Sequence, residues 1–437
     1  MKKNAWLLFA VLPLSFGDMQ MDGPAARAFD PRIDNPTRLS PNQPLERSMM
    51  KIAEVKSARA SARMWSDRTW DHTRALLGER YTDDRFVGLR TWTEKKEYNA
   101  HYSAEGALSL PRGDEVQRTW IAALSPAEKY DVVMGTIRGG LYDRMADKLD
   151  SEMDSAGRFP GWWGICEGSA AAAIAEPEPV KNVTVYSEAY GVDVPFYATD
   201  VKGLASMLWS SYNRNLRLPE MGQQCQAKVS ADSSEPACFD VNPGSMVIAL
   251  HHFLGRGNGN LIVDTDSTRV VWNHPVLGYE MSFFQPGNAS QGATSFQNGL
   301  LRVRDASGDP RRRLRASGTA YILGVNMKLS YGQNEKKVPW QGSINRQERV
   351  MDLSFELELD DSFNILGGEW LSPKHPDIMW TIPRGLRPDT QGDRLLGEGS
   401  WDGQSAPATW TNAAFKSAEG VMPLRRIVEG LVRRSAR

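Results

Sequence analysis

Two segments in the C-terminal third of the chain alternate apolar and polar side chains, and this pattern constrains the fold more than any other feature. Apolar residues occupy every second position over residues 321–331, and the same spacing returns over residues 351–359. A period of two is that of a β-strand with one buried face, as in antiparallel sheets. We therefore expect residues 301–437 to form a β-rich region, with a short helix near residues 424–431.

Helix signals are concentrated in the middle of the chain. The run Ser125-Pro126-Ala127-Glu128 is a capping box with proline at the first helical position, so a helix should begin there. A second, amphipathic helix is expected over residues 199–212. An apolar run at residues 245–254 and a short β-branched run at 261–264 are joined by a glycine-rich stretch, which predicts a β-hairpin. Helices and antiparallel strands in one chain indicate the α+β class.

The N-terminus has the pattern of an export signal. Lys2 and Lys3 precede an apolar segment at residues 6–16 that is too short to span a bilayer. We expect a signal peptide over residues 1–28, a secreted or periplasmic protein and no stable membrane insertion. Residues 29–100 are polar and proline-containing, which indicates an N-terminal extension or pro-region whose early part is extended or loosely packed. Within it, a helix is expected over residues 45–65.

Composition excludes several classes of partner. The formal net charge is −1, which argues against binding to nucleic acid or to a membrane surface. Neighbouring His251 and His252 have no third ligand at a suitable spacing, so no metal site is expected. We expect no cofactor, since the sequence also contains no glycine-rich phosphate-binding loop.

The three cysteines separate into a pair and a single residue. Cys225 and Cys238 flank a polar loop, and export permits a disulfide between them. Cys166 is then a free thiol. Glycine and tryptophan precede it and small residues follow it, which places its sulfur at the first turn of a helix, where the dipole favours a thiolate. We therefore predict that Cys166 is a nucleophile, although a small buried residue at a helix start is the plainer alternative.

A cysteine nucleophile needs a base and a group that orients the base. In the predicted hairpin, His251 faces Asp264 on the adjacent strand, and a carboxylate there would fix the tautomer of the imidazole. His252 and His274 are alternative bases. The alternative for His251 and His252 is that they are ordinary strand residues, one packed and one exposed to solvent.

Several separated motifs resemble the elicitor-type transglutaminase family. The segment from Val271 to Tyr279 (VWNHPVLGY) is similar to the surface peptide of these proteins, and the segment from Trp163 to Cys166 (WGIC) is similar to their nucleophile segment. Similar motifs recur over residues 120–381. The resemblance implies a papain-like cysteine-enzyme core, in which a Cys-bearing helix packs on an antiparallel sheet. It also implies a Cys–His–Asp constellation within residues 101–300, completed by the β-rich C-terminal region.

The resemblance assigns Cys166 as nucleophile and Asp264 as the acidic residue. The histidine position of the family corresponds to Val247, so His251, His252 and His274 are the available substitutes, with His251 preferred. Glu167 stands where the family has histidine, and Pro160 occupies the approximate position of the oxyanion glutamine of papain. On the substrate side we expect Trp163, Trp272, His274 and Pro275 to line the site, with the indole of Trp163 as a candidate oxyanion donor.

The expected activity is γ-glutamyl transfer from protein glutamine to a lysine or another amine through a Cys166 thioester. The partners would be proteins with accessible glutamine and lysine side chains. Two alternatives use the same sequence features. One is a cysteine peptidase or deamidase with the same thiol chemistry, and the other is a catalytically impaired secreted protein that acts by recognition through its surface.

Overall fold

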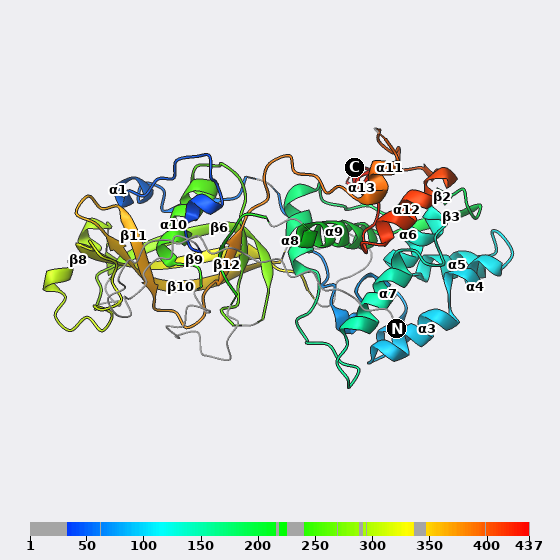
Figure 1. The fold of residues 1–437 in the computed structure, drawn as a ribbon, viewed down its shortest axis with the longest axis horizontal. Coiled ribbons are helices and arrows are strands. Elements are labelled where there is room, and N and C mark those ends of the chain that lie inside the picture. The colour runs from blue at the N-terminus through cyan, green and yellow to red at the C-terminus, as the bar shows by residue number, and fades with distance from the viewer. Residues whose placement is uncertain are drawn as a thin grey trace, which may run out of the picture.

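A computed structural model describes residues 33–61, 63–215, 218–224, 240–268, 270–287, 292–293, 295–335, 347–397 and 399–436. Figure 1 shows that the chain forms a sheet-rich half and a helix-rich half that meet near helix α8 (Cys166–Ala175). Each half has its own cluster of buried apolar side chains. The predicted signal peptide and the predicted Cys225–Cys238 disulfide lie outside the described residues. Among those residues, no helix combines the length and the apolar character needed to cross a membrane.

One large sheet organises the sheet-rich half. Its strands follow the order β11-β10-β9-β6-β5-β12-β4. In addition, β1 and β7 pair with β6, and β8 pairs with β9. The bounds are β1 Ser57–Arg59, β4 Glu220–Gly222, β5 Ile262–Asp264, β6 Asn273–Phe284, β7 Gly292–Ala293, β8 Leu300–Arg302, β9 Tyr321–Gly332, β10 Glu348–Leu359, β11 Ile365–Trp370 and β12 Ile378–Trp380.

The two alternating segments form the longest antiparallel pair of this sheet. Strands β9 and β10 pair from Tyr321↔Leu359 to Gly332↔Glu348, and the inward side chains Leu323, Val325 and Leu329 are fully buried. The alternation therefore predicted both strands and their buried face correctly. The fold is α+β, as expected.

The predicted strand at residues 245–254 is wrong, because these residues are helical. Helix α10 spans Pro243–Leu250 and passes directly into a π-helical turn, η5, at His251–Gly255. Asn242 caps the helix by accepting from the N–H of Gly244, and Pro243 occupies its first turn. Every residue of α10 is buried against the sheet. A uniformly apolar run has no period that separates strand from helix, so the hairpin prediction fails with it.

The helix-rich half consists mainly of helices. Its helices are α2 Asp84–Val87, α3 Trp92–His101, α4 Ala104–Ser109, α5 Glu115–Ala123, α6 Pro126–Met134, α7 Leu141–Glu152, α8 Cys166–Ala175, α9 Ala198–Asn215, α11 Gln391–Leu395, α12 Thr411–Ala418 and α13 Arg425–Ser435. A small sheet of β2 Val183–Ser187, β3 Val192–Phe196 and β13 Ser405–Ala406 lies beside them.

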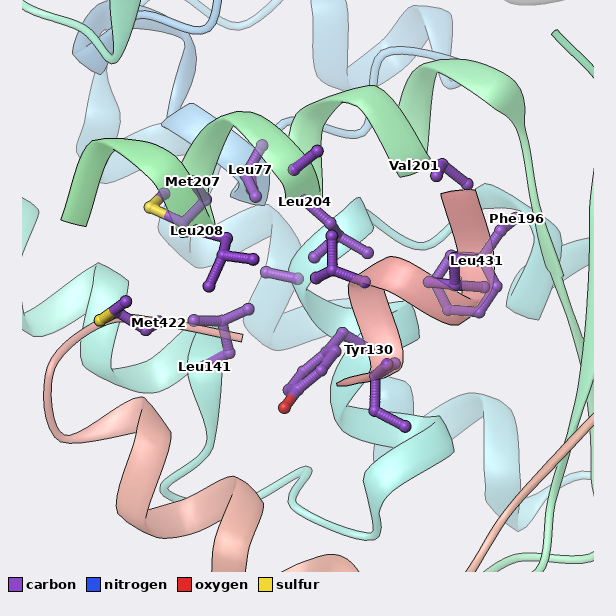
Figure 2. Packing of buried hydrophobic residues seen from close by; sticks show 14 of the residues in the cluster. Leu77, Tyr130, Leu141, Phe196, Val201, Leu204, Met207, Leu208, Met422 and Leu431 are labelled. Carbon is purple, nitrogen blue, oxygen red and sulfur yellow. The ribbon is translucent and has the colours of Figure 1, made fainter. Parts of the chain in front are cut away.

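Long-range packing around α9 holds this half together. Figure 2 shows Leu204 and Leu208 of α9 in one buried cluster with Tyr130 of α6 and Leu431 of α13. The helix predicted over residues 199–212 is confirmed, and so is the capping box that starts α6. The predicted C-terminal helix is α13, and it returns the end of the chain to the helical half. Residues 301–437 are therefore β-rich only as far as β12.

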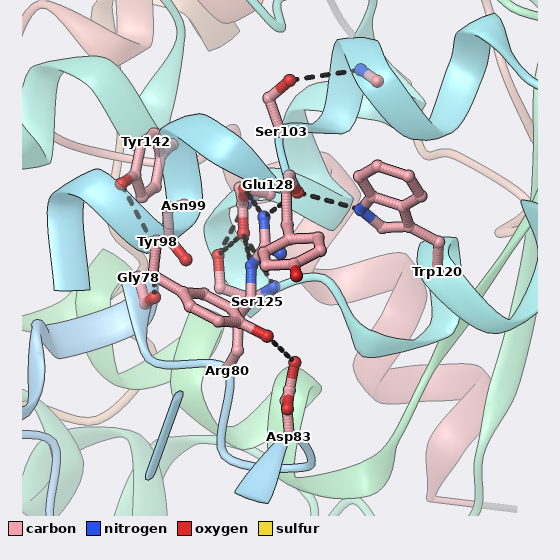
Figure 3. Close-up of polar contacts among 12 residues, drawn as sticks. Gly78, Arg80, Asp83, Tyr98, Asn99, Ser103, Trp120, Ser125, Glu128 and Tyr142 are labelled. Carbon is pink, nitrogen blue, oxygen red and sulfur yellow. Dashed lines mark hydrogen bonds and ion pairs between the residues drawn. The ribbon is translucent and has the colours of Figure 1, made fainter. Parts of the chain in front are cut away.

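A buried ion pair joins the N-terminal segment to α6. Arg80 donates to both carboxylate oxygens of Glu128, at 2.5 and 3.0 Å, and to the carbonyl of Tyr102 (Figure 3). The Glu128 carboxylate also accepts from Ser125 in the capping box. Both charged side chains are almost fully buried, so each provides the charge compensation that the other needs.

Residues 45–100 of the predicted N-terminal extension pack into the fold. The helix predicted over residues 45–65 is only the single turn α1 (Met49–Ile52), and β1 then pairs with β6. Trp65, Trp70 and Phe86 are buried in the core of the helical half. Short 3₁₀ turns complete the segment: η1 Pro36–Arg38, η2 His72–Arg74 and η3 Leu76–Gly78. This segment contributes apolar side chains to both halves.

Candidate active site

Cys166 is the first residue of α8, as predicted. The extended residues before it are fixed by the segment at Trp70, because the Ile165 N–H donates to the Trp70 carbonyl at 3.2 Å. Gly164 is needed at this crossing, since a Cβ there would lie 2.6 Å from the same carbonyl oxygen. The free thiol therefore stands at a helix start whose entry direction is set by backbone contacts.

Polar groups surround the sulfur. Sγ lies 3.9 Å from Oε2 of Glu167 and 3.7 Å from the carbonyl oxygen of Val271. Burial raises the pKa of Cys166 to about 12, and the nearby charges of Glu167 and Asp264 act in the same direction. Burial and the two carboxylates thus oppose the helix dipole and favour the protonated thiol in the resting site.

Asp264 is brought to the sulfur by the end of β5. It is fully buried, and its Oδ1 accepts from the backbone N–H groups of Trp272, at 2.8 Å, and Asp266, at 3.2 Å. Its Oδ2 has no hydrogen-bond partner among the described residues. Burial raises the pKa of Asp264 to about 7, and the charges of Asp266 and Asp240 also favour its protonated form.

Asn273 is a site residue that the sequence analysis missed. It lies directly opposite Asp264 in the β5–β6 pair. Its Oδ1 accepts from the indole of Trp380 at 2.7 Å, which turns the amide NH₂ toward other partners. Hydrogen bonds from its backbone and side chain to Cys166 favour the thiolate. The sequence did contain a hint of this role, because Asn273 lies between Trp272 and His274 in the segment that resembles the surface peptide of the family.

A pocket of about 690 Å³ opens over the sulfur. It lies where the two halves meet, since its walls come from the 69–74 segment, the start of α8, the start of β6 and the end of β9. Four aromatic residues are among those that line it: Trp70, Trp162, Trp272 and Tyr331. A long, partly aliphatic side chain could enter such a pocket and present its terminal group to the thiol.

The structure brings some of the predicted substrate residues together and leaves others apart. Trp272 and His274 line the pocket with Cys166. Trp163 lies in a neighbouring hollow beside Phe159, with its ring edge-on to His72. Pro275 is buried in β6, paired with Ile262.

The three candidate histidines occupy two places. His274 lines the pocket, where its ring contacts Tyr331 and a backbone hydrogen bond joins it to Gly332. Burial lowers the pKa of His274 to about 4, so the imidazole is neutral. His251 and His252 belong to the π-turn instead and are buried there. The pairing of His251 with Asp264 required the hairpin and is wrong.

The sulfur itself makes no hydrogen bond to a histidine within the described residues. A search of the same residues finds no group of three or more His, Cys, Asp or Glu side chains suited to a metal ion. The arrangement can therefore be described as a thiol with carboxylates beside it and amide donors against it. Such a site is suited to acyl transfer, in which donors stabilise an oxyanion and a base accepts the thiol proton.

Comparison with known proteins gives a family and a similar fold. A family model described as transglutaminase elicitor matches residues 144–394. The crystal structure of the GP42 transglutaminase from Phytophthora sojae is similar, with 18% sequence identity and a TM-score of 0.50, over 88% of this chain and 99% of that chain. At this identity the likeness concerns the fold alone. A search of curated proteins found no match.

Proposed function

Because the chain belongs to the transglutaminase elicitor family, we propose that it is a protein-glutamine γ-glutamyltransferase. The observation that carries this proposal is the position of Cys166, at the first turn of α8 and on the wall of the aromatic pocket. The matched segment contains this residue together with Asp264 and Asn273. The proposed partners are proteins with accessible glutamine and lysine side chains.

The proposed reaction has two halves. The sulfur of Cys166 attacks the γ-carboxamide carbon of a glutamine, the C–N bond breaks, and ammonia leaves with the thiol proton. A lysine amine then attacks the thioester, and the thiol is regenerated as the isopeptide bond forms. The amide of Asn273 and the backbone N–H of Cys166 are the proposed donors to the oxyanion, which replaces the earlier expectation for Trp163.

Asp264 and His274 are the proposed supporting residues. Asp264 keeps its role as the acidic member, since its charge acts on the sulfur. His274 is the candidate histidine that shares the pocket with Cys166, where it is proposed to contact the substrate. With Trp162 and Trp272 on the same wall, the pocket would restrict water at the thioester. A helix-borne cysteine beside an antiparallel sheet agrees with a papain-like core, which we include in the proposal.

Export is a further part of the proposal. The N-terminal signal and the Cys225–Cys238 disulfide support each other, since an oxidising compartment permits the bond. Thiol titration of the denatured mature protein is expected to give one reactive thiol, that of Cys166. Three thiols would contradict the disulfide and weaken the case for export.

The test is incorporation of a fluorescent primary amine into a glutamine-rich acceptor protein. The wild-type protein should label the acceptor, and Cys166→Ala should abolish labelling while its circular dichroism spectrum is unchanged. Cleavage of the acceptor would instead indicate a peptidase. Ammonia release without labelling would indicate the deamidase alternative, in which water resolves the thioester.

A catalytically inactive recognition protein is the second candidate. Two observations favour it: the pKa of the Cys166 thiol is raised, and no histidine among the described residues forms a hydrogen bond with the sulfur. Its expected recognition segment is partly enclosed, however, since Trp272 and Asn273 are half-buried and His274 and Pro275 are buried in β6. Absence of both labelling and ammonia release by the wild-type protein would leave this candidate standing.

A further inference from the structure

Glu167 directly follows the nucleophile and is held against it from two sides. Its Oε2 is the carboxylate oxygen that accepts from the Cys166 thiol, at 3.9 Å. Its Oε1 accepts from the hydroxyl of Ser210 on α9, at 2.6 Å. One oxygen of the carboxylate is therefore fixed by the neighbouring helix while the other faces the sulfur.

A glycine makes this arrangement possible. Gly168 lies at the crossing of α8 and α9, and a Cβ there would come within 2.5 Å of both the N and the Cβ of Ser210. The two helices approach closely enough for the short hydroxyl side chain of Ser210 to reach Glu167. The contact between Glu167 and Ser210 thus depends on the packing that also places the nucleophile.

The other groups near the sulfur are less suited to accept its proton. The Val271 contact is a backbone carbonyl, which is not a proton acceptor at neutral pH. Oδ1 of Asp264 already accepts two backbone N–H groups, and within the described residues no hydrogen bond joins this carboxylate to the sulfur. His274 shares the pocket but is bonded to the backbone of Gly332. Glu167 is the carboxylate with a hydrogen bond to the reacting atom.

We propose that Glu167 is the general base of the reaction, accepting the Cys166 proton during attack and delivering it to the departing ammonia. This rests on the proposed transferase function. In the first half, the S–H bond breaks as the S–C bond forms, the proton passes to Oε2, and it then moves to the leaving nitrogen as the C–N bond breaks. In the second half, Glu167 takes a proton from the attacking amine and returns it to the sulfur.

The contact length is compatible with this role. Catalytic hydrogen bonds are often long without substrate and shorten in the reacting complex. Ser210 is a positioning residue in this account, since it orients the carboxylate without touching the sulfur. The carboxylate also has an opposing effect, because its negative charge next to the sulfur disfavours a free thiolate.

Loss of the base and loss of the negative charge are expected to change two measurable rates in opposite directions. In Glu167→Gln, amine transfer should fall by roughly 10²–10⁴-fold at neutral pH, the range for loss of a general base. Alkylation of Cys166 by iodoacetamide needs only the thiolate, and it should become faster in the same variant because a neighbouring negative charge is gone. We would measure both rates between about pH 6 and 9 on the full mature chain, together with Glu167→Asp, which keeps a carboxylate and should recover part of the transfer rate.

The control is Glu176→Gln at the other end of α8. The Glu176 carboxylate accepts from the indole of Trp209 rather than from the sulfur, so both rates should stay at wild-type values. A general disturbance of α8 by Glu167→Gln would lower alkylation and transfer together, and would overturn the assignment. Undiminished transfer in Glu167→Gln would overturn it as well, and loss in His274→Asn would then assign the base to the histidine.

The two proposals fail in different ways. Absence of transfer by the wild-type protein would refute the transferase, and with it the role of Glu167 as base. The alkylation rates would still show whether the carboxylate and the sulfur are coupled. Transfer by wild type with equal transfer by Glu167→Gln would refute the role of Glu167 alone.

Discussion

Replacement of Gly168 by alanine tests the packing that holds the nucleophile. A Cβ at Gly168 would lie 2.1 Å from the backbone oxygen of Ser206, about 1.3 Å closer than the 3.4 Å of ordinary contact. The obstacle is backbone of α9, so α8 has to move. Overpacking of this kind costs about 1–3 kcal/mol, whereas alanine alone would stabilise a helix interior by about 1 kcal/mol relative to glycine. The difference between these two terms gives an expected net loss of up to about 2 kcal/mol in the free energy of unfolding.

Activity should fall further than stability in Gly168→Ala. Cys166 lies two residues away on the same helix, and a displacement of about 1 Å at a reacting atom costs on the order of 10²-fold in rate. Urea unfolding followed by tryptophan fluorescence gives the first quantity and amine incorporation gives the second. Gly161→Ala is the matched control, because a Cβ there meets nothing within 4 Å. A Gly168→Ala protein as stable and active as the control would refute the helix-crossing argument.

Three further measurements test the wider account. Arg80→Met leaves the buried Glu128 carboxylate without its partner and should lower the free energy of unfolding in urea by about 3–5 kcal/mol. The same change at the exposed Arg138 should leave this free energy unchanged. Equal losses in the two variants would contradict the claim that burial makes the Arg80–Glu128 pair important. Burial raises the pKa of Glu369 to about 8, so the native state retains a proton that the unfolded chain releases above about pH 4.5, and this contribution to stability is lost as the pH rises toward 8. Glu369→Gln should therefore reduce the fall in urea midpoint between about pH 5 and 8, and an unchanged fall would refute this. In the Asn273→Ala protein, transfer should drop by roughly 10²–10³-fold if the amide stabilises the oxyanion, and a wild-type rate would remove it from the site.

Local signals in the sequence predicted several elements accurately. Strands β9 and β10 carry apolar side chains at every second position because one face of each packs into the core, so period alone identifies them. The capping box of α6 and the start of α8 at Cys166 are equally local, since the residues that set each boundary are adjacent in sequence.

Helix α10 shows where local signals fail. Its residues are buried on all sides, so the run is apolar at every position and carries no period. The informative feature was the preceding Asn242-Pro243 pair, which is a cap followed by a first-turn proline. The glycine-rich stretch after the run suggested a hairpin turn instead, and that interpretation also misplaced His251.

The candidate site was only partly predictable for a related reason. Cys166 carries its own signal in the residues around it. Asn273 meets the sulfur only through the packing of α8 against β6, and Ser210 contacts Glu167 only through the crossing of α8 and α9. The ionisation of the thiol likewise depends on burial and on Asp264 from a distant segment, which no local pattern contains, as well as on the adjacent Glu167.

The most direct measurement of the central claim is the mass of the acyl-enzyme. The mature protein would be mixed with a glutamine peptide in the absence of any amine, quenched in acid and analysed by intact-protein and peptide mass spectrometry. The account predicts an adduct equal to the peptide less one ammonia, located on Cys166 and released by an added primary amine. Amine incorporation that proceeds with no adduct on Cys166, or that persists in Cys166→Ala, would contradict it.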